Sequence, residues 1–456
     1  MIQSSSFVDP SCPGDGGGMS LAARPITISP HNNELLKFIT WYPGAEFPMF
    51  QPIRTGRLIV WLGCIAGMTS LSIDLILPSL PMMESEFGLA PGKGGLSTSL
   101  FMTGYFLTPL LGGLLSDGIG RAKTLYASLL LYAAASILCA AAPGHALLFA
   151  GRLLQGCGVG IAVTMPLAIV SETFAGHDAR AHMSLVNTVS GCMPIVLPLL
   201  GAFIAGARGW RAVFAAQSAA AIAMVLLGTV CFRTPPAEQQ GKTLPQPPIK
   251  IQLQAIFKHH RFCLLAVIYG LMFACVFSFI SASPLLLMKR MGMSRGVFSL
   301  VFALNSCGTI CGSLCAAYLH GKMKQSRRLG GAGLVLILAC SLLAFTLQAA
   351  GLHRPIAILP EVWLALFGFG LAAPEITMGA LDTVPDQLGL GSGVLHCVLM
   401  LFGSVASGLM AELCSRHLQS AELVTTAAMV VAAAAAMGLY RQCIRRSPAE
   451  FSPART

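Results

Sequence analysis

Long apolar stretches recur along the chain and limit what it can fold into. Each is about 18 to 25 residues long, and a helix of that length crosses the roughly 30 Å of hydrocarbon in a bilayer. A backbone exposed to lipid must satisfy its own hydrogen bonds, so we expect every pass to be helical. The stretches lie near residues 58–80, 97–116, 124–142, 146–170, 184–206, 210–232, 262–287, 296–320, 330–350, 356–380, 391–413 and 422–440. The sequence therefore predicts an all-α membrane protein with twelve transmembrane helices.

The composition favours lipid over water as the solvent of most of the surface. Of the 456 residues, 55% are hydrophobic and only 10% are charged, whereas soluble domains carry roughly 25% charged residues. The alternating pattern of an outer-membrane strand is not seen, and several spans are apolar on every face. Helical spans are therefore the expected form.

The distribution of basic residues predicts the orientation in the membrane. With the N-terminus placed in the cytoplasm, 20 Lys and Arg fall in cytoplasmic segments, 8 fall in external segments, and Arg152 lies inside a span. This positive-inside pattern places both termini in the cytoplasm, and we expect a bacterial inner membrane protein in contact with lipid. Nucleic-acid binding would instead gather the net charge of +11 on one folded face, so it is not expected.

The first 56 residues differ from the rest of the chain. They contain SSS, PGDGGG and several prolines but no sustained apolar run, which predicts a mostly disordered cytoplasmic tail. No apolar stretch follows a basic start, so a signal peptide is not indicated. Met49 lies just before the first span, so translation from Met49 instead of Met1 is an alternative that stays open.

A second polar stretch, residues 233–261, separates spans six and seven. Its prolines and mixed polar residues predict an exposed cytoplasmic linker, with a short amphipathic helix at Ile249–Phe257. The linker divides the chain into six-helix halves at residues 57–232 and 262–440, followed by a basic cytoplasmic tail at 441–456. Two halves joined in this way are expected to face each other across a cavity near the membrane midplane.

Cysteine and histidine give no pattern of a metal or catalytic site. Most of the 15 Cys lie inside apolar spans, where Cys packs as a small, soft residue. Cys307, Cys311 and Cys315 share a helical face, but no carboxylate joins them in that span, and its one His, His320, lies at the helix end. The ten His are scattered among the tail, loops and helix ends. We therefore expect no cofactor, no metal and no catalytic residues, and a membrane enzyme is a disfavoured alternative.

The loop between spans two and three carries the first resemblance to a family. It reads GLLSDGIGRAK from Gly113 to Lys123 and resembles the signature loop of the major facilitator superfamily. Four residues fall on its positions, namely Gly113, Asp117, Gly120 and Arg121. The usual Arg after the Asp is Gly118 here, and the paired base comes one place late. We expect Gly113 to allow close helix packing, Gly120 to permit a tight turn, and the loop to gate the cytoplasmic side.

Further motifs follow in the order of that superfamily. Span four opens with GRLLQGCGVG, in which Arg152 and Gln155 resemble the superfamily's span-four Arg motif. Span five carries SGCMPIVLPLLGAF, which is similar to the antiporter motif of the bicyclomycin/chloramphenicol-resistance (Bcr/CflA-like) drug:proton antiporters. The residues that carry this likeness are Gly191, Pro194, Pro198 and Gly201, whereas Leu197 and Ala202 depart from it. The segments IDLILPSLP, GWRAVF and SASPLLL resemble the same subfamily.

The resemblance implies a function as well as a fold. It implies a monomeric, proton-coupled antiporter that exports small amphiphilic molecules, drugs or related metabolites, by alternating access. A proton symporter for uptake of a small polar nutrient is the second interpretation, and the span-five motif disfavours it. A channel would need repeated pore-lining signatures, which the sequence lacks.

Two charged residues within spans indicate where coupling takes place. An ionised side chain deep in a span costs roughly 2.5–3.5 kcal/mol, so it normally faces a cavity or a partner. At 1.5 Å per residue, Asp74 lies roughly 24 Å from the cytoplasmic end of span one, and Arg152 lies roughly 9 Å from the external end of span four. Both therefore fall in the external half. We expect Asp74 and Arg152 to form a proton switch, with a static structural ion pair as the alternative.

Other polar and aromatic residues are candidates for the substrate cavity. Glu375 follows Pro374 in span ten, where it either attracts substrate or lies wet at the cytoplasmic mouth. Gln155 of span four accompanies Arg152. Tyr105 and Phe277 belong to a group of aromatic residues that provides an adaptable apolar surface for substrate, or that simply packs in the core.

Overall fold

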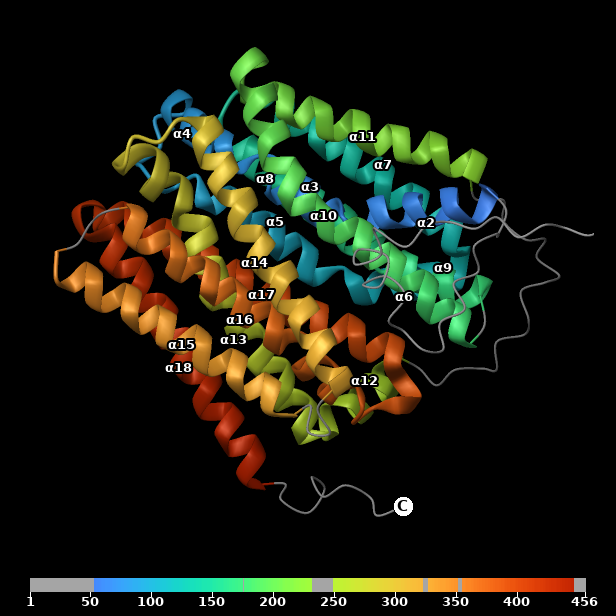
Figure 1. Ribbon diagram of the computed structural model, residues 1–456. Coiled ribbons are helices and arrows are strands. Elements are labelled where there is room, and N and C mark those ends of the chain that lie inside the picture. The colour runs from blue at the N-terminus through green and yellow to red at the C-terminus, as the bar shows by residue number, and fades with distance from the viewer. Residues whose placement is uncertain (1–52, 175, 232–248, 323–326, 352–354, 447–456) are drawn as a thin grey trace, which may run out of the picture. The chain divides into compact units, whose positions relative to one another are not determined.

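The computed structural model describes residues 53–174, 176–231, 249–322, 327–351 and 355–446. Within these ranges every regular element is a helix, so the all-α prediction is confirmed. The early helices are drawn in blue to green and the late helices in yellow to red (Figure 1). Residues 233–248 of the linker predicted at 233–261, residues 1–52 of the tail predicted at 1–56 and residues 447–456 of the tail predicted at 441–456 lie outside the described residues.

The helices follow the predicted spans closely. The N-terminal half contains α2 (Ile53–Ala66), α3 (Met68–Ile73), η1 (Leu77–Ser79), α4 (Leu80–Glu86), α5 (Gly95–Leu107), α6 (Pro109–Ile119), α7 (Arg121–Ala140), α8 (His145–Ala162), α9 (Met165–Thr173), α10 (Gly176–Arg208) and α11 (Trp210–Cys231). The C-terminal half contains α13 (His260–Ser283), η3 (Pro284–Arg290), α14 (Arg295–Lys322), α15 (Arg327–Ala349), α16 (Pro355–Leu381), η4 (Pro385–Gln387), α17 (Leu388–Arg416), η5 (Leu418–Ser420) and α18 (Ala421–Arg446).

Among the described residues, ten helices are long and apolar enough to cross a membrane. The pair Gly56–Ala66 and Met68–Glu86, bent by 45°, adds an eleventh if it is one span. The predicted second span is divided at Thr108 and Pro109 into α5 and α6, so neither piece reaches spanning length alone.

Two boundaries differ from those predicted, and the predicted short helix before span seven is present. The amphipathic helix expected at Ile249–Phe257 is α12 (Ile249–Lys258). Helix α2 begins at Ile53, inside the predicted tail, and α18 continues to Arg446, six residues past the predicted end of span twelve. Both extensions carry Arg residues at the helix ends, where basic side chains can reach the membrane surface while the helix continues.

Glycines allow the same kind of close helix packing in both halves. In the N-terminal half, a Cβ on Gly104 or Gly156 would lie 2.0 or 1.9 Å from a carbonyl oxygen of the facing helix, because α5 and α8 touch backbone to backbone. In the C-terminal half, a Cβ on Gly312 or Gly370 would lie 2.1 Å from a carbonyl oxygen across the contact of α14 with α16. Small residues at crossings are the usual basis of tight helix packing in membranes.

Candidate functional site

A seam of small polar side chains joins the two halves. The Ser404 hydroxyl of α17 bonds with the Thr103 hydroxyl of α5 at 2.7 Å, and Ser99 donates to the Ser404 carbonyl at 2.8 Å. One helical turn away, Ser407 donates to the Gly95 carbonyl at 3.0 Å. These contacts hold α5 of the first half against α17 of the second.

An ion pair closes one end of this seam. Glu84, at 4% exposure, lies at the end of α4, and its Oε2 is 2.5 Å from Lys289 Nζ of η3. Its Oε1 accepts the backbone N–H groups of Gly92 and Gly94 at 2.9 and 2.8 Å. We call this end of the bundle the Glu84 end. The carboxylate thus ties its own loop and the other half together.

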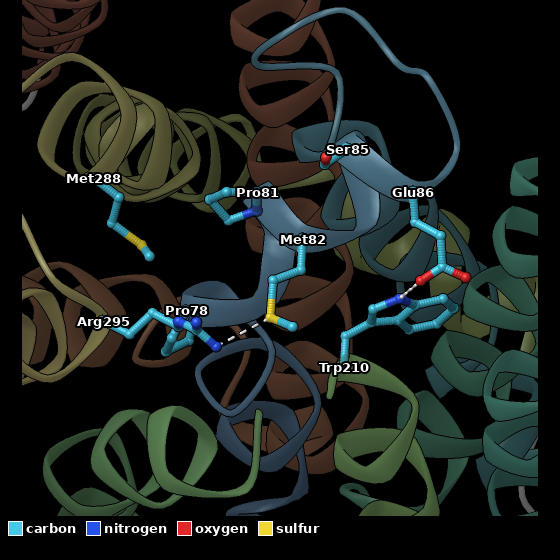
Figure 2. Close-up of a pocket in the computed structure, with 8 residues that line it drawn as sticks. All are labelled: Pro78, Pro81, Met82, Ser85, Glu86, Trp210, Met288 and Arg295. Carbon is cyan, nitrogen blue, oxygen red and sulfur yellow. Dashed lines mark hydrogen bonds between the residues drawn. The ribbon is translucent and has the colours of Figure 1, made fainter. Parts of the chain in front are cut away.

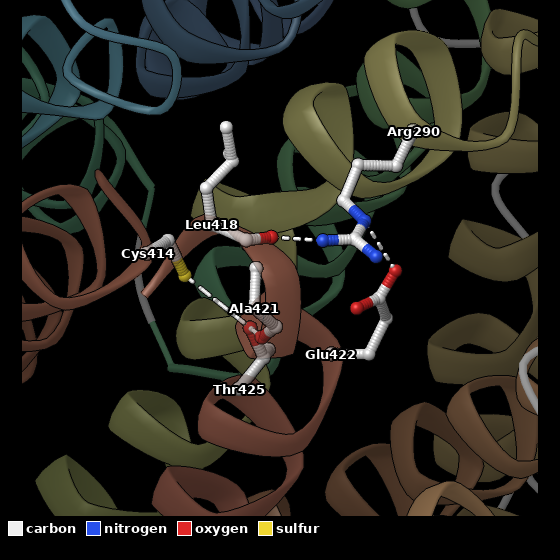
Figure 3. Close-up of polar contacts among 6 residues, drawn as sticks. All are labelled: Arg290, Cys414, Leu418, Ala421, Glu422 and Thr425. Atoms are coloured by element: carbon white, nitrogen blue, oxygen red, sulfur yellow. Dashed lines mark hydrogen bonds and ion pairs between the residues drawn. The ribbon is translucent and has the colours of Figure 1, made fainter. Parts of the chain in front are cut away.

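Arg290, the residue after Lys289, attaches η3 to its own half. Arg290 Nε is 2.8 Å from Glu422 Oε1 of α18, and its guanidinium also donates to the Leu418 carbonyl (Figure 3). Lys289 and Arg290 are consecutive residues of η3, a short π-helix. Segment η3 therefore holds its own half through Arg290 and reaches across to the other half through Lys289.

Asp74 lies at a break in the first span. Helix α3 ends at Ile73, and Pro78 has no N–H to offer the Asp74 carbonyl four residues earlier. The Asp74 side chain is only 8% exposed, and it accepts a hydrogen bond from Ser70, one turn earlier in the same helix. A buried carboxyl group next to a broken helix is typical of a functional position in a membrane protein.

Helix α10 fixes this break by direct backbone contact. A Cβ on Gly201 would lie 2.0 Å from the carbonyl oxygen of Leu75, the residue after Asp74. Gly201 belongs to the predicted antiporter motif, and its lack of a side chain is what allows α10 to touch span one here. Pro194 and Pro198 lie inside α10 without ending it. A Cβ on Gly191 would meet nothing within 4 Å, so that residue does not serve this contact.

Arg152 is the centre of a buried polar network. It is 0% exposed, and its Nη1 donates to Gln155 Oε1 at 2.8 Å while Nε donates to the Ser97 carbonyl at 3.3 Å. Its guanidinium carbon is 4.6 Å from the centre of the Phe101 ring. Its Nη2 is buried without a hydrogen-bond partner in the described part of the chain. Buried donors of this kind normally have a partner, so this one is available to a group in another state.

The network reaches span one through a residue that the sequence analysis missed. Gln155 Nε2 donates to Gln217 Oε1 of α11 at 3.1 Å, and Gln217 Nε2 donates to the Leu71 carbonyl of α3 at 2.8 Å. The described residues contain no ion pair between Asp74 and Arg152. The chain Arg152–Gln155–Gln217 leads instead to the backbone one turn before Asp74. The sequence offered one signal for Gln217, namely an amide side chain within an otherwise apolar span.

The predicted cavity residues lie in three different surroundings. Tyr105 and Phe277 are 2% and 4% exposed, and they share one apolar cluster at the contact of the halves. The Gln155 side chain is fully buried. Glu375 packs within the C-terminal half, where its Cγ lies 3.2 Å from the position of a Cβ on Gly330 of α15. Its role in the cavity stays a prediction.

The signature loop has the predicted turn but not the predicted packing. Gly120 has φ +94°, a conformation that favours glycine, and it separates α6 from α7. Arg121 donates to the Ser116 hydroxyl. The close approach predicted at Gly113 is wrong, because a Cβ there would meet nothing within 4 Å, whereas one on Gly112 would lie 3.2 Å from Ile161 Cα. The Asp117 side chain lies outside those described.

Solved structures of other proteins share the overall fold of this chain. A bacterial homologue of the human lysosomal transporter Spinster, in an inward-facing and unoccupied conformation, has a TM-score of 0.70 at 16% identity, covering 89% of this chain and 100% of that one. A D-xylose-proton symporter has a TM-score of 0.63 at 17% identity, covering 84% and 96%. At such identities the likeness concerns the fold alone, and the fold is the predicted one of twelve helices in two halves.

Sequence relatives point the same way. The multidrug resistance protein MdtL of Escherichia coli O9:H4 (strain HS) is 26% identical over 331 residues, 72% of this chain and 80% of the relative. The MFS-type transporter YdgK of Bacillus subtilis (strain 168) is 26% identical over 352 residues, 76% and 87%. The profile of the Major Facilitator Superfamily matches residues 62–408. The chain therefore belongs to the major facilitator superfamily and is a membrane transporter.

Proposed function

We propose that this transporter is a proton-coupled antiporter that exports amphiphilic small molecules. The basic residues orient it with both termini in the cytoplasm, and the Glu84 end then faces outside. A relative named for multidrug resistance and the span-five motif with Gly201 support export. Lys289 joins the halves at the Glu84 end, which under the proposed orientation is the outer end, and this contact supports an interpretation as a state closed to the outside.

The observation that carries the proposal is the position of Asp74. It is a buried carboxyl group at a break in span one, and the break is braced by the backbone contact between Gly201 and Leu75. A rearrangement of α10 against span one would therefore change the surroundings of Asp74. This is the coupling that an antiporter needs between a proton site and a moving helix.

Proton movement and substrate movement then alternate. With the outside closed, substrate enters from the cytoplasm and takes up the space between the halves. When the Glu84 end opens, α4 separates from η3 and Asp74 is hydrated and binds a proton from outside. The substrate leaves, the outside closes again, and the proton departs to the cytoplasm. Inward proton flow thus drives outward export.

Arg152 has a defined part in this cycle. Its unpartnered Nη2 offers a buried donor for an acceptor, either the ionised Asp74 or a polar group of the substrate. Protonation of Asp74 removes the first of these acceptors. The network through Gln155 and Gln217 keeps the guanidinium in place while its remaining partner changes.

Aromatic side chains of α13 and α16 suit an apolar part of the substrate. The Phe273 and Phe277 rings are 4.9 Å apart, and Phe369 of α16 lies 6.2 Å from Tyr269 and 6.3 Å from Phe273. Phe273, Tyr269 and Phe369 are only partly buried. Such a surface accepts apolar groups of varied shape.

The test is export with and without the Asp74 carboxylate. In proteoliposomes with an imposed pH gradient, ethidium and chloramphenicol serve as probes, and proton flux is followed with a pH-sensitive dye. Asp74→Asn should abolish substrate-dependent proton flux and leave the protein inserted in the membrane. Asp382→Asn, which changes an exposed carboxylate at the end of α16, is the matched control. Full coupled export by Asp74→Asn refutes the proposal, and coupled uptake instead of export establishes the symporter.

A further inference from the structure

A pocket of about 490 Å³ lies between the halves at the Glu84 end. Its walls in the first half include Pro81 and Met82 of α4 and Trp210 of α11, and its walls in the second half are Met288 of η3 and Arg295 of α14 (Figure 2). A volume of this size is sufficient for a small amphiphile. The pocket shares Pro78 with the break in span one, but neither Asp74 nor Arg152 lines it.

The charges of the pocket favour an anion. Its carboxylate, Glu86, is already neutralised, because Oε2 accepts the Trp210 indole N–H at 2.5 Å and Oε1 pairs with Arg211. Its cation, Arg295, forms no ion pair within the described ranges. The Arg295 contacts are long ones from Nη1, at 3.3 Å to Met82 Sδ and 3.4 Å to the Ala205 carbonyl. Most of the guanidinium donors are therefore available to a ligand.

The remaining walls suit an apolar chain. The side chains of Met82 and Met288 and the ring of Trp210 border the space into which Arg295 points (Figure 2). Methionine is flexible and polarisable, and so adapts to varied shapes. A guanidinium beside two thioethers and an indole matches a molecule with an anionic head and an apolar tail.

We propose that this pocket binds anionic amphiphiles from outside, and that its occupancy inhibits the transporter by holding the Glu84 end closed. The inhibition follows from geometry. The ligand contacts α4 and α11 in one half and η3 and α14 in the other, and opening this end separates them. A ligand that binds the closed state better must shift the population toward it. This inhibitory site goes beyond the proposed function, and its binding can be measured without transport.

Binding is tested by quenching of the pocket indole. Of the four Trp, Trp41, Trp61 and Trp363 are replaced by Phe, which leaves Trp210 as the reporter in the full chain in nanodiscs. We expect saturable quenching by 11-bromoundecanoate and only weak, unsaturable quenching by 11-bromoundecanol. Arg295→Gln should weaken the apparent affinity for the carboxylate at least about tenfold, the loss expected for a hydrogen bond to a charged group.

A matched control and a second variant make the result decisive. Arg208→Gln removes an exposed Arg at the end of α10, near Ala205 but outside the pocket, and should leave the affinity unchanged. Met288→Glu places a carboxylate inside the pocket and should weaken binding about as much as Arg295→Gln. It provides the test if Arg295→Gln does not reach the membrane. Equal quenching by the two probes, or an affinity that neither variant changes, overturns the site.

The inhibitory effect has its own readout. Hydrogen–deuterium exchange of peptides covering α4 and η3 should slow when decanoate is added, and should not change with decanol. The slowing should be lost in Arg295→Gln and kept in Arg208→Gln. Faster exchange at α4 and η3 on adding decanoate would show that the ligand opens this end, and would overturn the inhibitory assignment.

Discussion

Lys289 Nζ lies 2.5 Å from Glu84 Oε2, and this contact joins the two halves of the transporter at one end. The two partners differ in how they would respond to opening. Glu84 is almost fully buried and keeps two backbone N–H donors from its own half, whereas the Lys289 side chain is 29% exposed and can move into water. The ion pair can therefore break when the halves separate, while Glu84 keeps its backbone hydrogen bonds. We call this ion pair the latch.

Lys289→Gln should favour the state that is open at the Glu84 end. Removing one partner of a buried ion pair leaves the other without compensation and costs about 3–5 kcal/mol when burial is complete. The exposure of Lys289 reduces that figure, and we expect a shift of at least about tenfold in the open population. Faster hydrogen–deuterium exchange in α4 and η3 measures it.

Arg416→Gln is the control for the latch. Arg416 pairs with Glu412 at 2.6 Å on the same helix and at the same end of the bundle, and both side chains are exposed. The Arg416 contact stays within one half, and in this variant Glu412 keeps its own pairing across the halves with Lys93 at 3.8 Å. Its exchange pattern at α4 and η3 should equal that of the native protein. If Lys289→Gln and Arg416→Gln give the same exchange, the latch does not control opening.

Gly201→Ala should impair export strongly. A Cβ at this position would lie 2.0 Å from the Leu75 carbonyl oxygen, so α10 must move away from the break that carries Asp74. Overpacking of this kind costs about 1–3 kcal/mol. The expected results are a lower thermal midpoint in nanodiscs and export reduced at least about tenfold.

Gly191→Ala provides a comparison within the same helix and the same motif. A Cβ on Gly191 would meet nothing within 4 Å, so its stability should change by no more than a few tenths of a kcal/mol, with the helix propensity of Ala in its favour. If Gly191→Ala and Gly201→Ala lost stability and export equally, the contact of Gly201 with Leu75 would not be the basis of the motif.

The sequence was sufficient to predict the architecture and which residues are unusual. Apolar stretches of spanning length fix the helices, and a charge or amide inside such a stretch, as at Asp74, Arg152 and Gln155, stands out by its cost in lipid. How these residues pair was beyond prediction, because pairing depends on the rotation and depth of each helix to within an ångström or two. The link through Gln217 is of this kind.

Gly112 and Gly113 show the same limit at a smaller scale. Consecutive residues of a helix point about 100° apart, and nothing local decides which of two adjacent glycines faces the neighbouring helix. The structure places Gly112 against Ile161 and leaves Gly113 open. The pairing of Glu84 with Lys289 could not be predicted either. The two residues are about two hundred residues apart in the sequence, and both lie at the ends of spans, where charged residues are common.

Gly120→Ala should destabilise the protein, whereas Gly113→Ala should not. Gly120 has φ +94° and ψ 150°, and a side chain in such a region costs about 1–3 kcal/mol. Gly113 lies inside α6 with open space around it. Thermal unfolding of the two variants in nanodiscs should therefore differ by several degrees, and equal midpoints would mean that the turn between α6 and α7 tolerates a side chain.

Gln217→Leu isolates the polar network from the charge of Arg152. The change removes the acceptor of Gln155 Nε2 and the donor to the Leu71 carbonyl, and each buried group left without a partner costs about 1–3 kcal/mol. Gln155 still bonds Arg152 and Ser136, so the guanidinium stays in place. Export should fall while the protein remains inserted. Gln217→Glu, which keeps the acceptor for Gln155 but loses the donor to Leu71, should retain more activity than Leu. If the Leu variant exports as well as the native protein, the link between Arg152 and span one has no part in coupling.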